Sequence, residues 1–241
     1  MIIKHQDYKR KQLDDIINKT QIICITDIDG TYLDTNKATR YQQVKALAKI
    51  SGKNTTEINN IIEEEGLVKA VNKYMSLDEF FKNHYETFDP IKAAENGSMK
   101  VFPDAIEFTK SGIPTIAISN STQEATENKL KALKIINEFI AIYAEIDSQK
   151  SKPNIYLAEK AIKDLETEGW YNPKQTIVHV GDQEYDIQFG NNIKTIHHNT
   201  INILIEREKP YRGTTKPDIA IKSFSEIYKL IWGWKNDWRF F

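Results

Sequence analysis

The sequence predicts an α/β fold in which a doubly wound, mostly parallel sheet is interrupted early by a helical insert. Short apolar runs typical of buried strands recur along the chain, and amphipathic segments typical of helices separate them. This alternation indicates a parallel sheet covered by helices on both faces. The stretch 36–99 has amphipathic segments but no strand-like run. We therefore expect an α/β core domain of residues 1–35 and 100–241 and a separate helical domain of residues 36–99.

The predicted elements follow from these patterns in order. The first strand, "ICITD" at residues 23–27, is apolar up to an aspartate and is closely followed by a glycine, as expected of a buried strand that ends in a turn. The helix expected over residues 153–169 has a proline near its start and a glycine at its end, which is the usual asymmetry of helix termini. Further strands are expected at residues 113–119, 139–146, 176–182, 194–198 and 218–222, and further helices at 38–50, 55–75, 76–88, 125–136 and 224–233.

Composition limits the classes of partner and compartment. The 241 residues carry a formal net charge of −1, so the charge balance favours neither nucleic acid nor an anionic membrane. No stretch approaches the ~18 continuous apolar residues of a spanning helix. Cys24 is the single cysteine, so no disulfide can form within the chain. We expect a soluble cytoplasmic protein whose aromatic tail, "WGWKNDWRFF", packs on the core or on a neighbouring subunit of a homodimer.

Polar side chains collect where the predicted strands end. In open α/β sheets, ligands bind beyond the carboxyl ends of the strands. Several carboxylates at one place repel each other and raise each other's pKa values unless a cation lies among them. Carboxylate oxygens favour a hard ion, and Mg²⁺ characteristically takes one or two carboxylates plus substrate phosphate. A lysine and a hydroxyl beside such an ion would suit a phosphoryl group. The candidates are Asp27, Asp29, Ser119, Asn120, Lys152, Asp182 and Asp186.

Four short motifs place these residues in a known pattern. They are "DIDGT" from Asp27, "ISN" around Ser119, "SKP" around Lys152 and "GDQEYD" from Asp182. In order and approximate spacing they resemble the motifs of the haloacid dehalogenase (HAD) superfamily, over residues 22–221. The first and fourth motifs are specific, whereas the other two would mean little alone. The resemblance implies a Rossmann-like core, and it implies that the helical insert is a C1-type cap that closes over the active site.

The resemblance also implies a role for each candidate residue. Asp27 would be the nucleophile that forms an aspartyl-phosphate, and Asp29 would be the general acid and then the base that activates water. Two carboxylates two residues apart on an extended segment project to the same side, as these two roles require. Mg²⁺ would be bound by Asp27, the main-chain carbonyl of Asp29, Asp182 and Asp186, and phosphate by Ser119, Asn120 and Lys152.

The sequence leaves alternatives open. The leading function is a Mg²⁺-dependent phosphatase acting on a small phosphorylated metabolite. A phosphomutase acting on a sugar phosphate and a catalytically silent HAD-fold binding protein are the alternatives. Ser119 and Asn120 could instead cap the next helix, Lys150 could take the place of Lys152, and Asp186 could be a first-turn acid favoured by the helix dipole.

Overall fold

The chain divides into two compact units. A computed structural model describes residues 22–207, 210–227 and 230. Unit 1 consists of residues 1–34 and 101–241, and unit 2 consists of residues 35–100. Within the described part, no helix combines the length and the apolar character that crossing a membrane requires. The aromatic tail lies outside the described residues, as does part of the helix predicted over residues 224–233.

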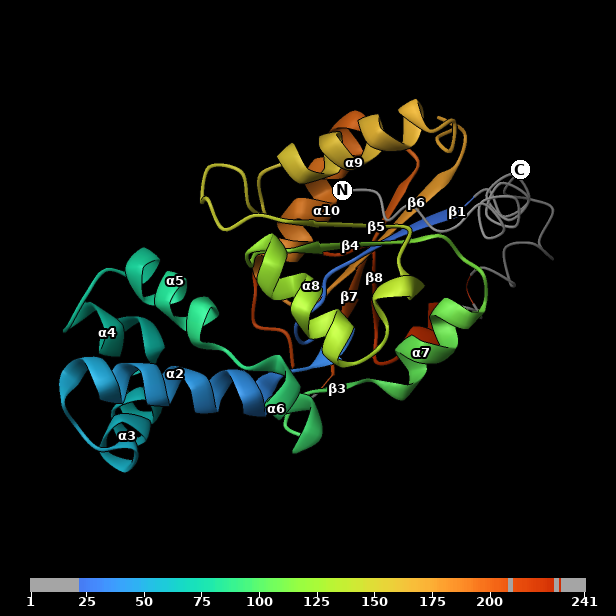
Figure 1. Ribbon diagram of the computed structural model, residues 1–241. Helices are drawn as coiled ribbons and strands as arrows, with labels where there is room; N and C mark the ends of the chain where they lie inside the picture. Colours follow the sequence, from blue (N-terminus) through green and yellow to red (C-terminus); the bar gives the residue numbers. More distant parts are fainter. Residues whose placement is uncertain (1–21, 208–209, 228–229, 231–241) are drawn as a thin grey trace. The chain divides into compact units, whose positions relative to one another are not determined.

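Unit 1 is built on a six-stranded sheet with the order β5-β4-β1-β6-β7-β8 (Figure 1). All neighbouring strands are parallel. From β1 the strands are added first on one side, as β4 and β5, and then on the other, as β6, β7 and β8, which creates a topological switch point beside β1. The predicted doubly wound parallel sheet is confirmed. Its strands are β1 (Ile22–Thr26), β4 (Thr115–Ser119), β5 (Ala141–Ala144), β6 (Thr176–Gly181), β7 (Thr200–Ile205) and β8 (Ile219–Ile221).

Helices cover both faces of this sheet (Figure 1). Successive strand residues point to opposite faces. Cys24 therefore packs in the cluster on one face with Phe108 and Leu130, while Ile23 packs on the other face with Leu157. Because both faces are buried, β1 reads as a continuous apolar run. Helices α7 (Pro103–Lys110) and α8 (Gln123–Ala132) cover the first face, and helices α9 (Tyr156–Thr167) and α10 (Glu184–Ile196) cover the second. The short helix η1 (Ile136–Glu138) follows α8.

The strand predicted over residues 194–198 is wrong. Helix α10 covers most of that segment, and β7 begins only at Thr200. The "GNN" that starts at Gly190 has the composition of a loop. In the fold Gly190 lies inside α10, where a Cβ atom would collide with the side chains of Asn202 and His179. The glycine thus allows close packing of the helix on β6 and β7, and this packing overrides the local preference for a turn.

Every regular element within residues 36–99 of unit 2 is a helix, as the sequence predicts. Its core includes Leu47, Ile58 and Phe80, all fully buried. The amphipathic segment 55–75 forms two helices because Gly66, with a φ of +83°, ends the first and starts the second. The helices are α2 (Asn36–Ser51), α3 (Thr55–Glu65), α4 (Leu67–Asn72), α5 (Leu77–Thr87) and α6 (Pro90–Glu95).

A two-stranded sheet forms where the chain leaves and re-enters unit 1. It pairs β2 (Leu33–Asp34) with β3 (Lys100–Val101). Arg207, beyond the end of β7, holds this region from within unit 1. Its guanidinium donates to the Thr31 carbonyl at 2.8 and 3.2 Å and to Asp104 Oδ2 at 2.7 Å, and it lies 4.0 Å from the ring centroid of Phe102. One side chain therefore contacts the backbone before the insertion and two side chains after it.

Candidate active site

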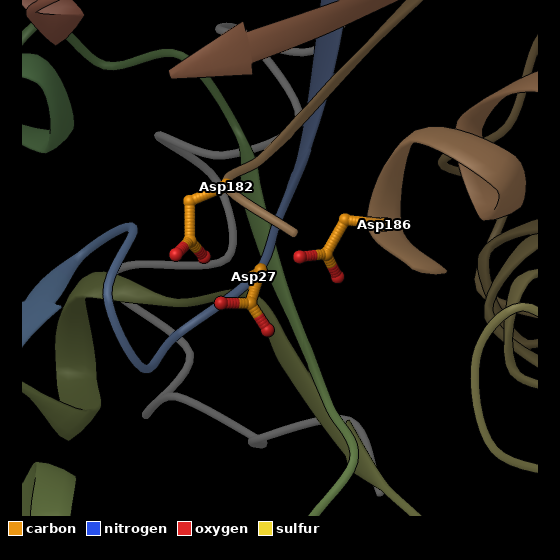
Figure 2. Close-up of side chains that lie close together, drawn as sticks. All are labelled: Asp27, Asp182 and Asp186. Carbon is orange, nitrogen blue, oxygen red and sulfur yellow. The ribbon is translucent and has the colours of Figure 1, made fainter. Parts of the chain in front are cut away.

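The strand register brings three carboxylates together at the carboxyl edge of the sheet. Thr26 of β1 lies opposite Val180 of β6, and the backbone N–H of Asp27 donates to the Val180 carbonyl at 2.9 Å. Asp27 therefore lies beside Asp182, which directly follows β6. Asp186 lies in the first turn of α10, and Figure 2 shows the carboxyl groups of Asp27, Asp182 and Asp186 lying close together. One oxygen from each lies within 4.8 Å of the others.

Lys152 is the buried cation of this cluster. Its Nζ donates to Asp27 Oδ1 and to the Ile118 carbonyl at 3.0 Å, and it lies 2.7 Å from Asp186 Oδ1. The alternative candidate, Lys150, is on the surface with a side chain that is 47% exposed. Lys152, not Lys150, is the lysine that the fold brings to the carboxylates.

Asp182 is held from two sides by neighbouring side chains. Thr31 Oγ1 donates to Asp182 Oδ1 at 3.0 Å, and the Gln183 amide donates to Asp182 Oδ2. Gly30 has a φ of +87°, and a Cβ there would lie 2.7 Å from Asp182 Oδ2. The glycine of "DIDGT" is thus required both for its backbone conformation and for the space that Asp182 occupies.

Asp186 combines two functions that the sequence left as alternatives. Its Oδ2 accepts a hydrogen bond from the backbone N–H of Gln183 at 3.0 Å, which is one half of a capping box at the start of α10. Its Oδ1 faces Lys152, and the residue is fully buried. Asp186 therefore caps the helix with one oxygen and belongs to the carboxylate cluster with the other.

The cluster is electrostatically unfavourable without a further cation. Burial raises the pKa of Asp27 well above its ordinary value, the charges of Asp186 and Asp182 add to this, and Lys152 opposes it. Burial and the charge of Asp186 likewise raise the pKa of Asp182 to about 6. For Lys152, burial alone lowers the pKa, but the two carboxylates it contacts raise it further than burial lowers it.

These residues fit a divalent metal ion. Asp27 Oδ2 is buried and has no hydrogen-bond partner among the described residues, which is the expected state of an oxygen that serves as a ligand. The donor set consists of carboxylate oxygens, which hard divalent cations prefer. Asp27, Asp182 and Asp186 are the residues that would hold the ion.

The side chain of Asp29 is engaged by a residue that the sequence did not single out. Lys129 of α8 lies with its Nζ 2.8 Å from Asp29 Oδ1 and 2.6 Å from Asp29 Oδ2. Lys129 is buried on the same face of α8 as Ala125 and Leu130. A lysine at the apolar spacing of an amphipathic helix was therefore the signal that could have identified it.

Ser119 and Asn120, at the end of β4, differ in their contacts. Ser119 is the buried last residue of β4 and thus lies at the carboxyl edge beside β1. Asn120 makes a reciprocal pair with the backbone of Lys152, donating from Nδ2 to its carbonyl at 2.8 Å and accepting its N–H on Oδ1 at 2.7 Å. Neither residue caps α8, because the side chain of Thr122 does so by accepting the N–H of Ala125. A phosphate contact of Ser119 and Asn120 stays a prediction.

Known structures share the fold of this chain. A HAD phosphatase from Thermococcus onnurineus is 20% identical with a TM-score of 0.62, covering 87% of this chain and 97% of that one. A predicted phosphoglycolate phosphatase from Haemophilus somnus is 18% identical with a TM-score of 0.61, covering 88% and 99%. A candidate β-phosphoglucomutase from Thermotoga maritima is 18% identical with a TM-score of 0.59, covering 86% and 97%. No curated protein matches the sequence.

The family follows from a match to the sequence itself. Residues 24–197 match the haloacid dehalogenase-like hydrolases, and this range includes the whole carboxylate cluster and the two lysines that contact the acidic side chains of the site. The resemblance noted from the four motifs is thereby confirmed. The match covers most of the chain, and it includes the carboxylates that lie at the switch point of the sheet. The chain therefore belongs to the family of haloacid dehalogenase-like hydrolases.

Proposed function

We propose that the protein is a Mg²⁺-dependent phosphatase that hydrolyses a small phosphorylated metabolite through an aspartyl-phosphate on Asp27. The observation that carries this proposal is the convergence of Asp27, Asp182, Asp186 and Lys152 at the carboxyl edge of β1. Carboxylates suit the ion, and the lysine suits the phosphoryl oxygens. The likeness to a structure named as a HAD phosphatase supports the same reaction.

In the first step the phosphoryl group would move to Asp27. An oxygen of the Asp27 carboxylate attacks phosphorus, the bond from phosphorus to the leaving oxygen breaks, and Asp29 gives its proton to that oxygen. Lys152, through its bond to Asp27 Oδ1, orients the nucleophile and places positive charge beside the group that is transferred. When bound, Mg²⁺ would supply the positive charge that offsets the repulsion between phosphate and the attacking carboxylate.

In the second step water would release the phosphate. Asp29, now a carboxylate, takes a proton from a water molecule whose oxygen attacks phosphorus. The bond between phosphorus and Asp27 then breaks, which restores the Asp27 carboxylate and frees inorganic phosphate. We assign Ser119, the last residue of β4, as a residue whose hydroxyl would donate to a phosphoryl oxygen in both steps.

We assign residues 36–99 as the cap that decides which substrate is accepted, with residues 1–35 and 100–241 as the catalytic core. The division of the chain into a unit of residues 35–100 and a second unit supports this assignment. A closed cap would keep water away from the phosphoryl group during the first step. We keep a homodimer and a cytoplasmic location as predictions.

A substrate panel tests the proposed function. Purified protein with Mg²⁺ is incubated with phosphorylated sugars, nucleotides, phosphoglycolate and 4-nitrophenyl phosphate, and inorganic phosphate is measured. A phosphatase releases phosphate from at least one ester. A sugar phosphate that is isomerised without phosphate release would indicate the phosphomutase instead. No turnover of any compound, with the fold verified, would favour a silent binding protein.

Replacing Asn120 with aspartate is expected to lower kcat by about 10- to 100-fold, with a smaller effect on KM, since small displacements of catalytic groups cost that much. The substitution keeps the size of the side chain but removes the N–H donor that holds the Lys152 carbonyl and sets a carboxylate against it. The backbone that carries the Lys152 ammonium would shift as a result.

The matched control for this variant is Asn154→Asp. Among the described residues, the one hydrogen bond of the Asn154 side chain is accepted from the N–H of Tyr156 at 2.8 Å, and an aspartate can accept the same bond. Steady-state kinetics of both variants would decide the role of Asn120. Equal rates for the two variants would contradict a positioning role for the amide.

A further inference from the structure

Lys129 places a second buried cation at the site, and the mechanism above does not use it. The lysine is 4% exposed, although it belongs to a helix with several other charged side chains. Its Nζ contacts both oxygens of Asp29, a hundred residues earlier in the chain. A lysine buried to this extent costs solvation free energy unless it is paired. The fold therefore keeps an ion pair at a position where an apolar residue would pack more cheaply.

The contact constrains the direction of the Asp29 side chain. An aspartate side chain has two rotatable bonds, and a contact to both oxygens restricts both of them. The Asp29 side chain is still 32% exposed, so the carboxyl group remains reachable from outside while Lys129 holds it. An ammonium can donate to a carboxylate and also to the carbonyl oxygen of a protonated carboxyl group. The restriction can thus persist in both protonation states that Asp29 passes through.

We propose that Lys129 is a positioning residue that directs the carboxyl group of Asp29 toward the leaving oxygen of the substrate. The proposal rests on the proposed function, because it gives Asp29 the proton-transfer role assigned there. A correctly oriented acid accelerates a reaction far more than one that samples many orientations. Loss of Lys129 would leave Asp29 in place but free to rotate.

The dependence of rate on the leaving group provides the test. Proton donation matters most for poor leaving groups, and it matters least for groups that depart readily as anions. We would measure kcat/KM for a series of aryl phosphates that runs from 2,4-dinitrophenyl phosphate to phenyl phosphate. The variant is Lys129→Met, which keeps the length and apolar packing of the stem. Lys131→Met on the same helix is the matched control, because Lys131 is exposed and pairs with Glu127.

The expected result is a selective loss. Lys129→Met should reduce kcat/KM for phenyl phosphate about tenfold more than for 2,4-dinitrophenyl phosphate. This tenfold difference is a part of the rate enhancement of about 10²- to 10⁴-fold that a general acid typically contributes. Lys131→Met should leave the series unchanged. The ratio between two substrates does not depend on the fraction of folded enzyme, so partial unfolding of the variant cannot imitate the result.

A double variant separates positioning from a general electrostatic effect. If Lys129 acts through Asp29, Asp29→Asn with Lys129→Met should show the same leaving-group dependence as Asp29→Asn alone. An equal loss on every ester with a raised KM would mean that Lys129 attracts the phosphate, and it would overturn the proposal. A series for Lys129→Met identical to that for Lys131→Met would overturn it as well. A wild-type enzyme inactive on every ester would instead overturn the proposed function itself.

Discussion

Asp27→Asn is expected to abolish turnover while the fold stays intact, with a loss of roughly 10³- to 10⁶-fold, as for other covalent nucleophiles. Asparagine keeps the shape of the side chain but lacks the charge and nucleophilicity that attack on phosphorus requires. The elevated pKa of Asp27 shows that the fold disfavours its charged form. A neutral residue removes that cost, so without divalent cation the variant should melt no lower than the wild type.

Phosphate release and thermal melting check both halves of this prediction. Asp147→Asn is the matched control, because Asp147 is an exposed aspartate that pairs with Lys150 at the surface. The control should keep full activity. More than a few per cent of residual activity in Asp27→Asn, with contamination excluded, would refute the covalent mechanism.

Removal of divalent metal is the second change with a large expected effect. Activity should vanish in EDTA and return with Mg²⁺, whereas Ca²⁺ should restore little because its larger and looser shell misplaces the reacting oxygens. Metal binding should also stabilise the fold, by about 2.7 kcal/mol at a concentration of 100 times Kd. Asp182→Asn removes one of the three carboxylates and should lose most of this stabilisation. Full activity without metal would contradict the metal-site assignment.

The stabilisation by Mg²⁺ should depend on pH in a defined direction. The pKa of Asp182 is raised from 3.8 to about 6, so the metal-free protein is destabilised by this carboxylate as the pH rises through that range. Bound Mg²⁺ would relieve this destabilisation where the Asp182 carboxylate is charged. Below about pH 6 protons compete with the ion, and the metal-dependent increase in melting temperature should decline. Thermal melts between pH 5 and 8 with and without Mg²⁺ would measure this.

The sheet and the acidic cluster could be predicted from sequence because both depend on short-range pattern. The apolar run before Asp27 marks β1, and the acid at its end follows directly from the position of the strand. The strand predicted from Lys194 was wrong because α10 continues past Gly190. The helix can pack there because Gly190 has no side chain to collide with Asn202 of β7 and His179 of β6. Nothing within a few residues of that glycine carries this information.

Two interactions of the candidate site were beyond sequence reasoning for the same reason. Lys129 meets Asp29 across a hundred residues, and Asn120 meets the backbone of Lys152 across thirty-two. A motif shows which residue types occur at a spacing, but it does not show which side chain a distant helix contributes. The local signal for Lys129 was only its place on the apolar face of α8.

The point of insertion has a consequence for how such a chain can diversify. Every residue proposed to take part in catalysis belongs to unit 1, and Arg207 links the Thr31 carbonyl before the insertion to the Asp104 side chain after it. The chain segments that lead into and out of the insertion also pair with each other, as strands β2 and β3. An exchange or rebuilding of residues 36–99 would leave both strands and the contacts of Arg207 in place. If residues 36–99 are the cap proposed above, substrate recognition and catalysis would evolve separately: changes within residues 36–99 would bring a new substrate, and the reaction catalysed by unit 1 would stay the same.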